Sequence, residues 1–179
     1  MRAKRGLLFA VAVLAFGMAG SSASSALAAI ITLEAELDPF QEVPPHNTPA
    51  YGSVEATLDT TSGAFSIVAG TGQYADLLGG SSSVRLSDGA AGANGPTISL
   101  LVLDDPGATT GTFSGSASPN LTMAQITDAM AGNTYINIAD SVYPSGELRG
   151  QLTVTPEPSS LVLAAMAAVG LLVAARKRL

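Results

Sequence analysis

The sequence predicts an all-β fold, a two-sheet antiparallel sandwich of about eight strands with one short helix. Two observations predict it. Short runs of alternating apolar and polar residues recur through the middle of the chain, as in strands with one buried face. Clusters of Gly, Ser, Thr, Asn, Asp and Pro separate these runs at intervals of roughly eight to twelve residues. Because the chain has no cysteine, its stability must come from burying an apolar core.

Eight segments carry the strand pattern: 30–37, 51–59, 63–69, 82–87, 97–103, 111–117, 133–139 and 147–154. The fifth of them contains the nearly continuous apolar run Ile98-Ser99-Leu100-Leu101-Val102-Leu103. Because this run is nearly continuous, we expect the strand to be central.

One stretch departs from the strand pattern and predicts a helix near 122–131. Its apolar residues at 123, 126, 129 and 130 share one helical face. Thr122 is a favoured N-cap residue, and Gly132 is a favoured residue just beyond a helix end.

The N-terminal segment 1–28 has the three parts of a secretory signal peptide. A basic start, Met1-Arg2-Ala3-Lys4-Arg5, precedes an apolar run, and small residues follow. Ala26 and Ala28 occupy the positions that signal peptidase reads, so we expect cleavage after Ala28. A retained membrane helix is the less favoured alternative, because the apolar run is short for a span.

The C-terminal segment 155–179 begins with Thr155 and Pro156-Glu157-Pro158-Ser159, continues with an apolar run, and ends in Arg176-Lys177-Arg178-Leu179. The apolar run predicts a transmembrane helix at 159–175, with the basic end in the cytoplasm and the domain on the periplasmic side of the inner membrane. This order resembles the PEP-CTERM sorting signal of Gram-negative bacteria. The resemblance implies processing by an exosortase, a membrane-embedded protease of cells that make extracellular polysaccharide.

The segment between the two ends is strongly acidic. Residues 29–155 contain 13 acidic side chains and only two basic ones, Arg85 and Arg149, for a formal charge of −11. Binding to nucleic acid depends on basic residues that neutralise phosphates, so nucleic acid is not an expected partner.

Segment 29–154 contains four short motifs: Glu42-Val43-Pro44-Pro45, Asn94-Gly95-Pro96, Tyr135-Ile136-Asn137-Ile138 and Gly146-Glu147-Leu148-Arg149-Gly150-Gln151. Taken together they resemble the CHRD domain, the module named after chordin. The last string is the most specific, and the resemblance covers nearly the whole segment. It implies structural roles for Glu42, Pro44, Pro45, Tyr135, Asn137, Gly146, Glu147, Arg149 and Gly150.

The chain departs from the family pattern at its histidines. The resemblance places a His-x-His pair near Val84 and Leu86, and a third histidine at Ala139. Imidazole is the commonest metal ligand and the usual general base near neutral pH, so these replacements argue against a histidine metal site. His46, in the Pro44-Pro45 loop, is expected to be an ordinary exposed residue. No cofactor and no catalytic residue are predicted.

Two further pairs have both a structural and a functional interpretation. Glu147 and Arg149 lie two apart and are expected to form cross-strand ion pairs at a sheet edge rather than an active site. Asp104 and Asp105 are weak candidates for calcium, but Asp-Pro-Gly is also favourable turn chemistry, and the ligand spacing of a dedicated calcium loop is missing.

These features predict an exported, non-catalytic surface or matrix module that binds an extracellular polysaccharide or an envelope protein, or has a structural role. A copper or zinc metalloprotein or enzyme is the alternative implied by the wider family's histidines. A calcium-stabilised adhesive domain is the third possibility.

Overall fold

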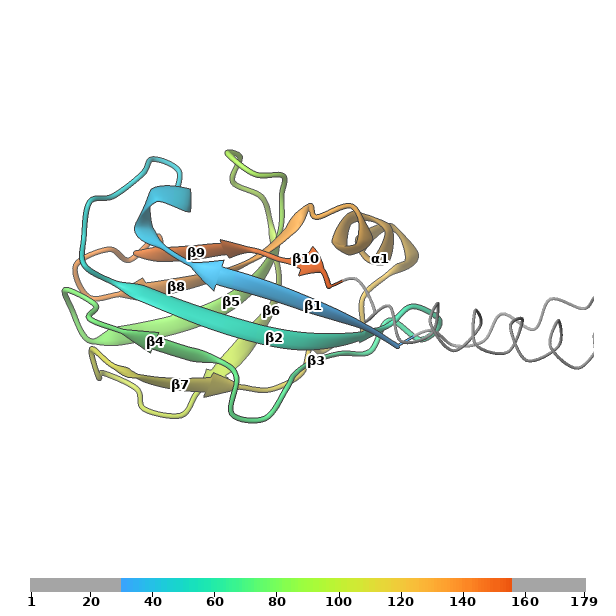
Figure 1. Cartoon of the computed structure of the whole chain (residues 1–179), viewed down its shortest axis with the longest axis horizontal. Helices are drawn as coiled ribbons and strands as arrows, with labels where there is room; N and C mark the ends of the chain where they lie inside the picture. Colours follow the sequence, from blue (N-terminus) through green and yellow to red (C-terminus); the bar gives the residue numbers. More distant parts are fainter. Residues whose placement is uncertain (1–29, 156–179) are drawn as a thin grey trace, which may run out of the picture.

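Ten antiparallel strands form one sheet in the computed structural model, which describes residues 30–155 (Figure 1). In chain order the elements are β1 (Ile30–Leu37), the 3₁₀ turn η1 (Pro39–Gln41), β2 (Tyr51–Asp59), β3 (Phe65–Ile67), β4 (Gln73–Ala75), β5 (Ser81–Asp88), β6 (Thr97–Leu103), β7 (Gly111–Ser114), α1 (Met123–Met130), β8 (Thr134–Asp140), β9 (Leu148–Gln151) and β10 (Thr153–Val154).

The sheet is nearly closed on itself. Its strand order is β10-β1-β2-β4-β7-β6-β5-β8-β9, with β3 paired to β2. Because β9 and β10 are consecutive in the chain, the two ends of this order meet. Beside them, Asp38 and Arg149 exchange backbone hydrogen bonds of 3.0 and 3.2 Å. The expected two-sheet sandwich is therefore not confirmed, since one continuous hydrogen-bonded path connects the strands.

Gly150 allows β1 to cross β9 at this junction. A Cβ atom at this position would lie 2.8 Å from the carbonyl oxygen of Glu36 and 3.1 Å from the Cβ of Ala35. Both contacts are closer than ordinary packing permits, so a side chain here would push the two strands apart. The predicted structural role of Gly150 is thus the close approach of two backbones.

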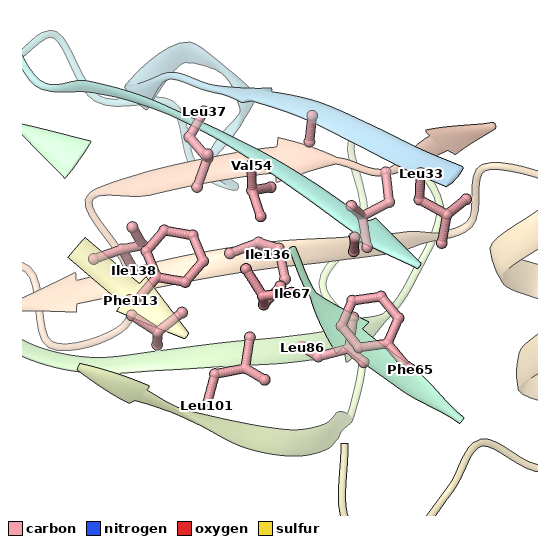
Figure 2. Packing of buried hydrophobic residues seen from close by; sticks show 14 of the residues in the cluster. Leu33, Leu37, Val54, Phe65, Ile67, Leu86, Leu101, Phe113, Ile136 and Ile138 are labelled. Atoms are coloured by element: carbon pink, nitrogen blue, oxygen red, sulfur yellow. The ribbon is translucent and has the colours of Figure 1, made fainter. Parts of the chain in front are cut away.

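The alternating strand patterns fill the interior of the sheet. Along β2, every second residue from Gly52 to Leu58 is buried. Figure 2 shows Leu33, Val54 and Ile136 pointing into the same interior as Leu101 and Phe113 from other strands. Apolar burial is the main source of stability in a cysteine-free domain.

Strand β6 is internal to the sheet, as expected, because it pairs with both β5 and β7. It is not covered on both faces, however. Leu100 and Val102 are 67% and 58% exposed, whereas Leu101 between them is buried. Hydrogen bonding places the strand centrally within the sheet, but none of the elements between residues 30 and 155 covers its outer face.

The predicted helix is present as α1. Thr122 caps it in a capping box with Gln125, and Gly132 follows with a φ of +76°, a conformation that favours glycine. Ile126 and Ala129 face the core, but Met123 and Met130 are exposed, so the apolar face is narrower than predicted. The helix contacts β10, β5 and β8 at the end of the sheet near β10 (Figure 1).

The remaining differences concern short elements. Strand β4 was not predicted, because its three residues show almost no alternation. The expected strand 147–154 is interrupted at Leu152, whose N–H donates to the carbonyl of Thr134. Among the described residues no helix is long and apolar enough to span a membrane. The predicted signal peptide 1–28 and transmembrane helix 159–175 lie outside them.

Candidate functional site

The family-motif residues gather on the outer face of β8 and β9. The inner face of β8 carries Ile136 and Ile138 in the core, and all seven of its residues are buried. Its outer face carries Tyr135, Asn137 and Ala139. Loops around residues 38–50, 89–96 and 141–147 lie over this face, and each hydrogen-bonds a side chain of the sheet: Glu42 bonds Asn137, Gly95 bonds Tyr135 and Ser145 bonds Arg85.

Arg149 is the centre of this covered face and is 0% exposed. Its guanidinium donates to the carbonyl oxygens of Ala90 at 2.9 Å and Ala93 at 3.0 Å, and to the Oε1 of Gln151 at 3.1 Å. The Cζ atom lies 3.6 Å from the centroid of the Tyr135 ring, a cation–π contact. The side chain thus ties loop 89–96 to the sheet.

Glu42 is the second buried charged group and is connected to Asn137. The Nδ2 of Asn137 donates to Glu42 Oε1 at 2.7 Å, and Asn137 Oδ1 accepts from Arg85 at 3.1 Å. Arg85 also donates to the carbonyl of Ser145 at 3.0 Å. Burial raises the pKa of Glu42 to about 7, and the charge of Arg149 acts in the opposite direction. Glu42 is therefore a carboxyl group that titrates near neutral pH.

Gly146, in the loop 141–147, lies directly against the side chains of Glu42 and Asn137. Its φ is +144°, and a Cβ atom there would overlap the amide nitrogen of Asn137 and lie 2.5 Å from Glu42 Oε1. The position therefore requires glycine for its backbone conformation and for space.

Glu147 and Arg149 do not form the expected ion pair at a sheet edge. Both are completely buried, and the Arg149 guanidinium donates to carbonyl and amide oxygens. The Glu147 carboxyl accepts instead from the N–H of Leu78 at 3.0 Å and lies against Asp140. The difference arises because loops distant in the sequence cover β9, which a strand pattern does not reveal.

Pro44 and Pro45 belong to the loop after η1. Pro45 lines a pocket of about 330 Å³ together with Phe40, Val43 and the loop residues Ala91 and Gly92. In the same loop His46 is half-buried and stacks on Tyr143, with 4.1 Å between the ring centroids. The expectation of an ordinary exposed His46 is therefore wrong, because the loop 141–147 packs against it.

The three positions where the family resemblance places histidines do not lie on one face of the sheet. Val84 and Leu86 point into the apolar core, as expected for residues that can only pack. Ala139 is also buried, but it pairs with Ser83 and therefore lies on the opposite face.

Asp104 and Asp105 lie at the exposed end of β6. The carboxylate of Asp104 accepts from the hydroxyls of Thr112 at 3.0 Å and Ser114 at 2.9 Å. Within residues 30–155 no group of three or more His, Cys, Asp or Glu side chains is placed to hold a metal ion. The weak calcium assignment stays a prediction.

We expect millimolar calcium to leave the melting temperature of the protein unchanged, because the Asp104 carboxylate already has two hydroxyl donors. Thermal unfolding with calcium and with an equal concentration of magnesium measures this. A rise in melting temperature seen with calcium and abolished by Asp104→Asn would establish a calcium site instead.

A hollow on the outside of β1 and β2, of about 580 Å³, was not predicted from the sequence. Glu34, Glu36 and Glu55 line it with Gln73, and Glu34 is directly opposite Glu55 in the strand register. Strand alternation places these glutamates outward, but only the pairing of β1 with β2 brings them together. Carboxylates and amides of this kind hydrogen-bond hydroxyl groups and attract cations.

The fold and this site define a small all-β domain whose conspicuous charged residues are buried between loops. The CHRD domain family matches residues 33–152, and the chain belongs to that family. The PEP-CTERM protein-sorting motif matches residues 154–178, which include Pro156, Glu157, Pro158 and Ser159. No curated protein and no solved structure matches the chain. The sorting motif implies an exported protein that is processed by an exosortase and sorted to the cell envelope.

Proposed function

We propose that this protein is a non-catalytic surface or matrix module, whose CHRD domain binds an extracellular polysaccharide or an envelope protein. The observation that carries the proposal is the combination of one CHRD domain with a PEP-CTERM tail in a single chain. Such a tail makes the envelope the place where the domain acts.

The chemistry of the buried face supports this proposal. Arg149 and Glu42, the charged groups that an active site would use, are buried, and their hydrogen bonds hold loops to the sheet. A catalytic group must reach its substrate within hydrogen-bond distance, and little of these two residues is exposed, 5% of Glu42 and 0% of Arg149, although both line the pocket of about 330 Å³ beside Pro45.

Deletion of the exosortase is expected to move the protein from the surface fraction to the inner-membrane fraction. The same shift is expected when Pro156, Glu157 and Pro158 are replaced by alanine in an otherwise normal strain. Replacing Ser160, the residue directly after Pro156-Glu157-Pro158-Ser159, with alanine is the matched control and should leave the protein at the surface. Immunoblots of separated cell fractions measure all three.

Unchanged surface fractionation without exosortase would contradict the sorting part of the proposal. The binding part has its own test, co-sedimentation of the protein with extracellular polysaccharide from the same cells. Stoichiometric copper or zinc in protein purified from its native envelope would overturn the non-catalytic part and favour a metalloprotein.

A further inference from the structure

Asp140 and Glu147 form a second buried polar centre that the proposed function does not use. Asp140 ends β8 and is 1% exposed, and Glu147 precedes β9 and is 0% exposed. The Asp140 carboxyl lies close enough to Glu147 to raise the pKa of the Glu147 carboxyl, and two ionised carboxylates buried at such a range repel each other.

The loop that connects β4 to β5 holds both groups from one side. Leu78 N–H donates to Glu147 at 3.0 Å, and a Cβ atom on the neighbouring Gly79 would lie 2.7 Å from Asp140 Oδ2. The carbonyl of Gly80 accepts from Ser141 N–H at 3.1 Å. The loops 76–80 and 141–147 are therefore in direct contact around the carboxyl pair.

One oxygen of the pair lacks a donor. Asp140 Oδ1 accepts from the N–H groups of Val142 and Tyr143, whereas Asp140 Oδ2 is buried without a hydrogen-bond partner among the described residues. A buried acceptor without a donor is costly, and a proton on the Glu147 carboxyl would supply the missing donor.

We propose that Asp140 and Glu147 share one proton, donated from the Glu147 carboxyl to Asp140 Oδ2, and that this proton latches the loops 76–80 and 141–147 together. Loss of the proton leaves two adjacent buried carboxylates that repel each other. The latch is closed at low pH and loosens as the pH rises.

The surrounding charges do not oppose this arrangement. The Thr48 hydroxyl, from the loop before β2, and the Leu78 N–H act to lower the pKa of Glu147, and His46 from the same loop as Thr48 stacks on Tyr143. Arg85 and Glu42 reach the loop 141–147 from its other side, at Ser145 and Gly146, and Asp76 is exposed on the β4–β5 loop. Of the two arginines in residues 30–155, neither acts on the Glu147 carboxyl. Burial first, and then Asp140, raise the pKa of Glu147.

Exposed apolar residues lie on both latched loops. Leu78 and Val142 are 51% and 54% exposed, and their own N–H groups donate to Glu147 and Asp140 respectively. Loosening of the latch is therefore expected to change first the backbone at these two residues.

The test is a carboxyl carbon NMR titration of the full chain, with wild type compared to Asp140→Asn. In this variant the amide replaces the shared proton, because asparagine donates to an ionised Glu147 while its oxygen still accepts from Val142 and Tyr143. The Glu147 midpoint should lie above its ordinary value in the wild type and move to lower pH in the variant. Hydrogen-exchange protection of Leu78 and Val142 should fall about tenfold per pH unit above the wild-type midpoint, and should not fall in Asp140→Asn.

Asp76→Asn is the matched control, because it removes an exposed carboxylate from the same loop. Asp76 has a φ of 59°, which asparagine tolerates. This control should titrate as the wild type does. A Glu147 midpoint at its ordinary value in the wild type, or one unchanged by Asp140→Asn, would overturn the proposal. Neither the NMR titration nor the hydrogen-exchange measurement involves polysaccharide or sorting. Their results are therefore independent of the proposed function.

Discussion

Replacing Arg149 with methionine is expected to lower the free energy of unfolding by about 3–5 kcal/mol. Methionine fills part of the same space but donates no hydrogen bond. The carbonyl oxygens of Ala90 and Ala93 would stay buried under the loop without a donor, and the contact with the Tyr135 ring would be lost. Urea denaturation of the purified protein measures the change.

Two variants test whether the planar set of N–H donors on Arg149 or its positive charge alone provides this stability. Arg149→Lys keeps the charge but cannot reach both carbonyls in the same planar geometry, so it should recover only part of the loss. Arg85→Met removes the other basic side chain of residues 30–155, which is half-buried, and should cost less than Arg149→Met. A buried ionic residue is sometimes replaced by an apolar one without loss. A change below about 1 kcal/mol for Arg149→Met would show that the loop rearranges to hydrate these carbonyls.

The Glu42 carboxyl is expected to make the stability of this protein fall as the pH rises from about 4.5 to about 7. Its pKa is higher in the folded state than in the unfolded state, so the folded state binds more protons in this window. The protonated carboxyl contributes its full stability below the pKa of Glu42 in the unfolded state. This contribution is lost as the pH rises through the pKa of Glu42 in the folded state. This difference between the two pKa values corresponds to about 3 kcal/mol of unfolding free energy.

Glu42→Gln is the variant that isolates this effect. Glutamine keeps an oxygen for Asn137 Nδ2 but does not titrate, so it resembles the protonated carboxyl. Between pH 4 and pH 8 the difference in unfolding free energy should shift by about 3 kcal/mol in favour of the variant. Glu36→Gln, at an exposed position on β1, is the control and should follow the wild type. Parallel curves for Glu42→Gln and wild type would show that Glu42 is ionised throughout.

The local elements were largely predictable. The alternation along β2 correctly places Val54, Ala56 and Leu58 inside, and the capping signals around Thr122 and Gly132 correctly locate α1. Such signals depend on residues within a few positions of each other, so they can be recognised from the sequence alone. The same reasoning missed β4, which forms because β2 and β7 offer hydrogen-bonding edges on either side of it.

The candidate site was recognisable only as a set of residues. The motif strings singled out Glu42, Asn137 and Arg149, and the structure brings these three together. Their environment was not predictable, because Arg149 is buried by loop residues more than fifty positions earlier in the chain. Asp140 was not singled out, since its significance depends on the buried Glu147 beside it.

The sequence by itself determined the spacing of the strands, the place of the helix, the family and the sorting motif. Only the tertiary structure decided that the strands form one nearly closed sheet, that Arg149 is buried, and that Glu42 titrates near neutral pH. The physical reason is the separation along the chain between the residues that interact. Strand and helix signals arise between near neighbours, whereas closure, burial and desolvation arise between segments that meet only when the chain folds.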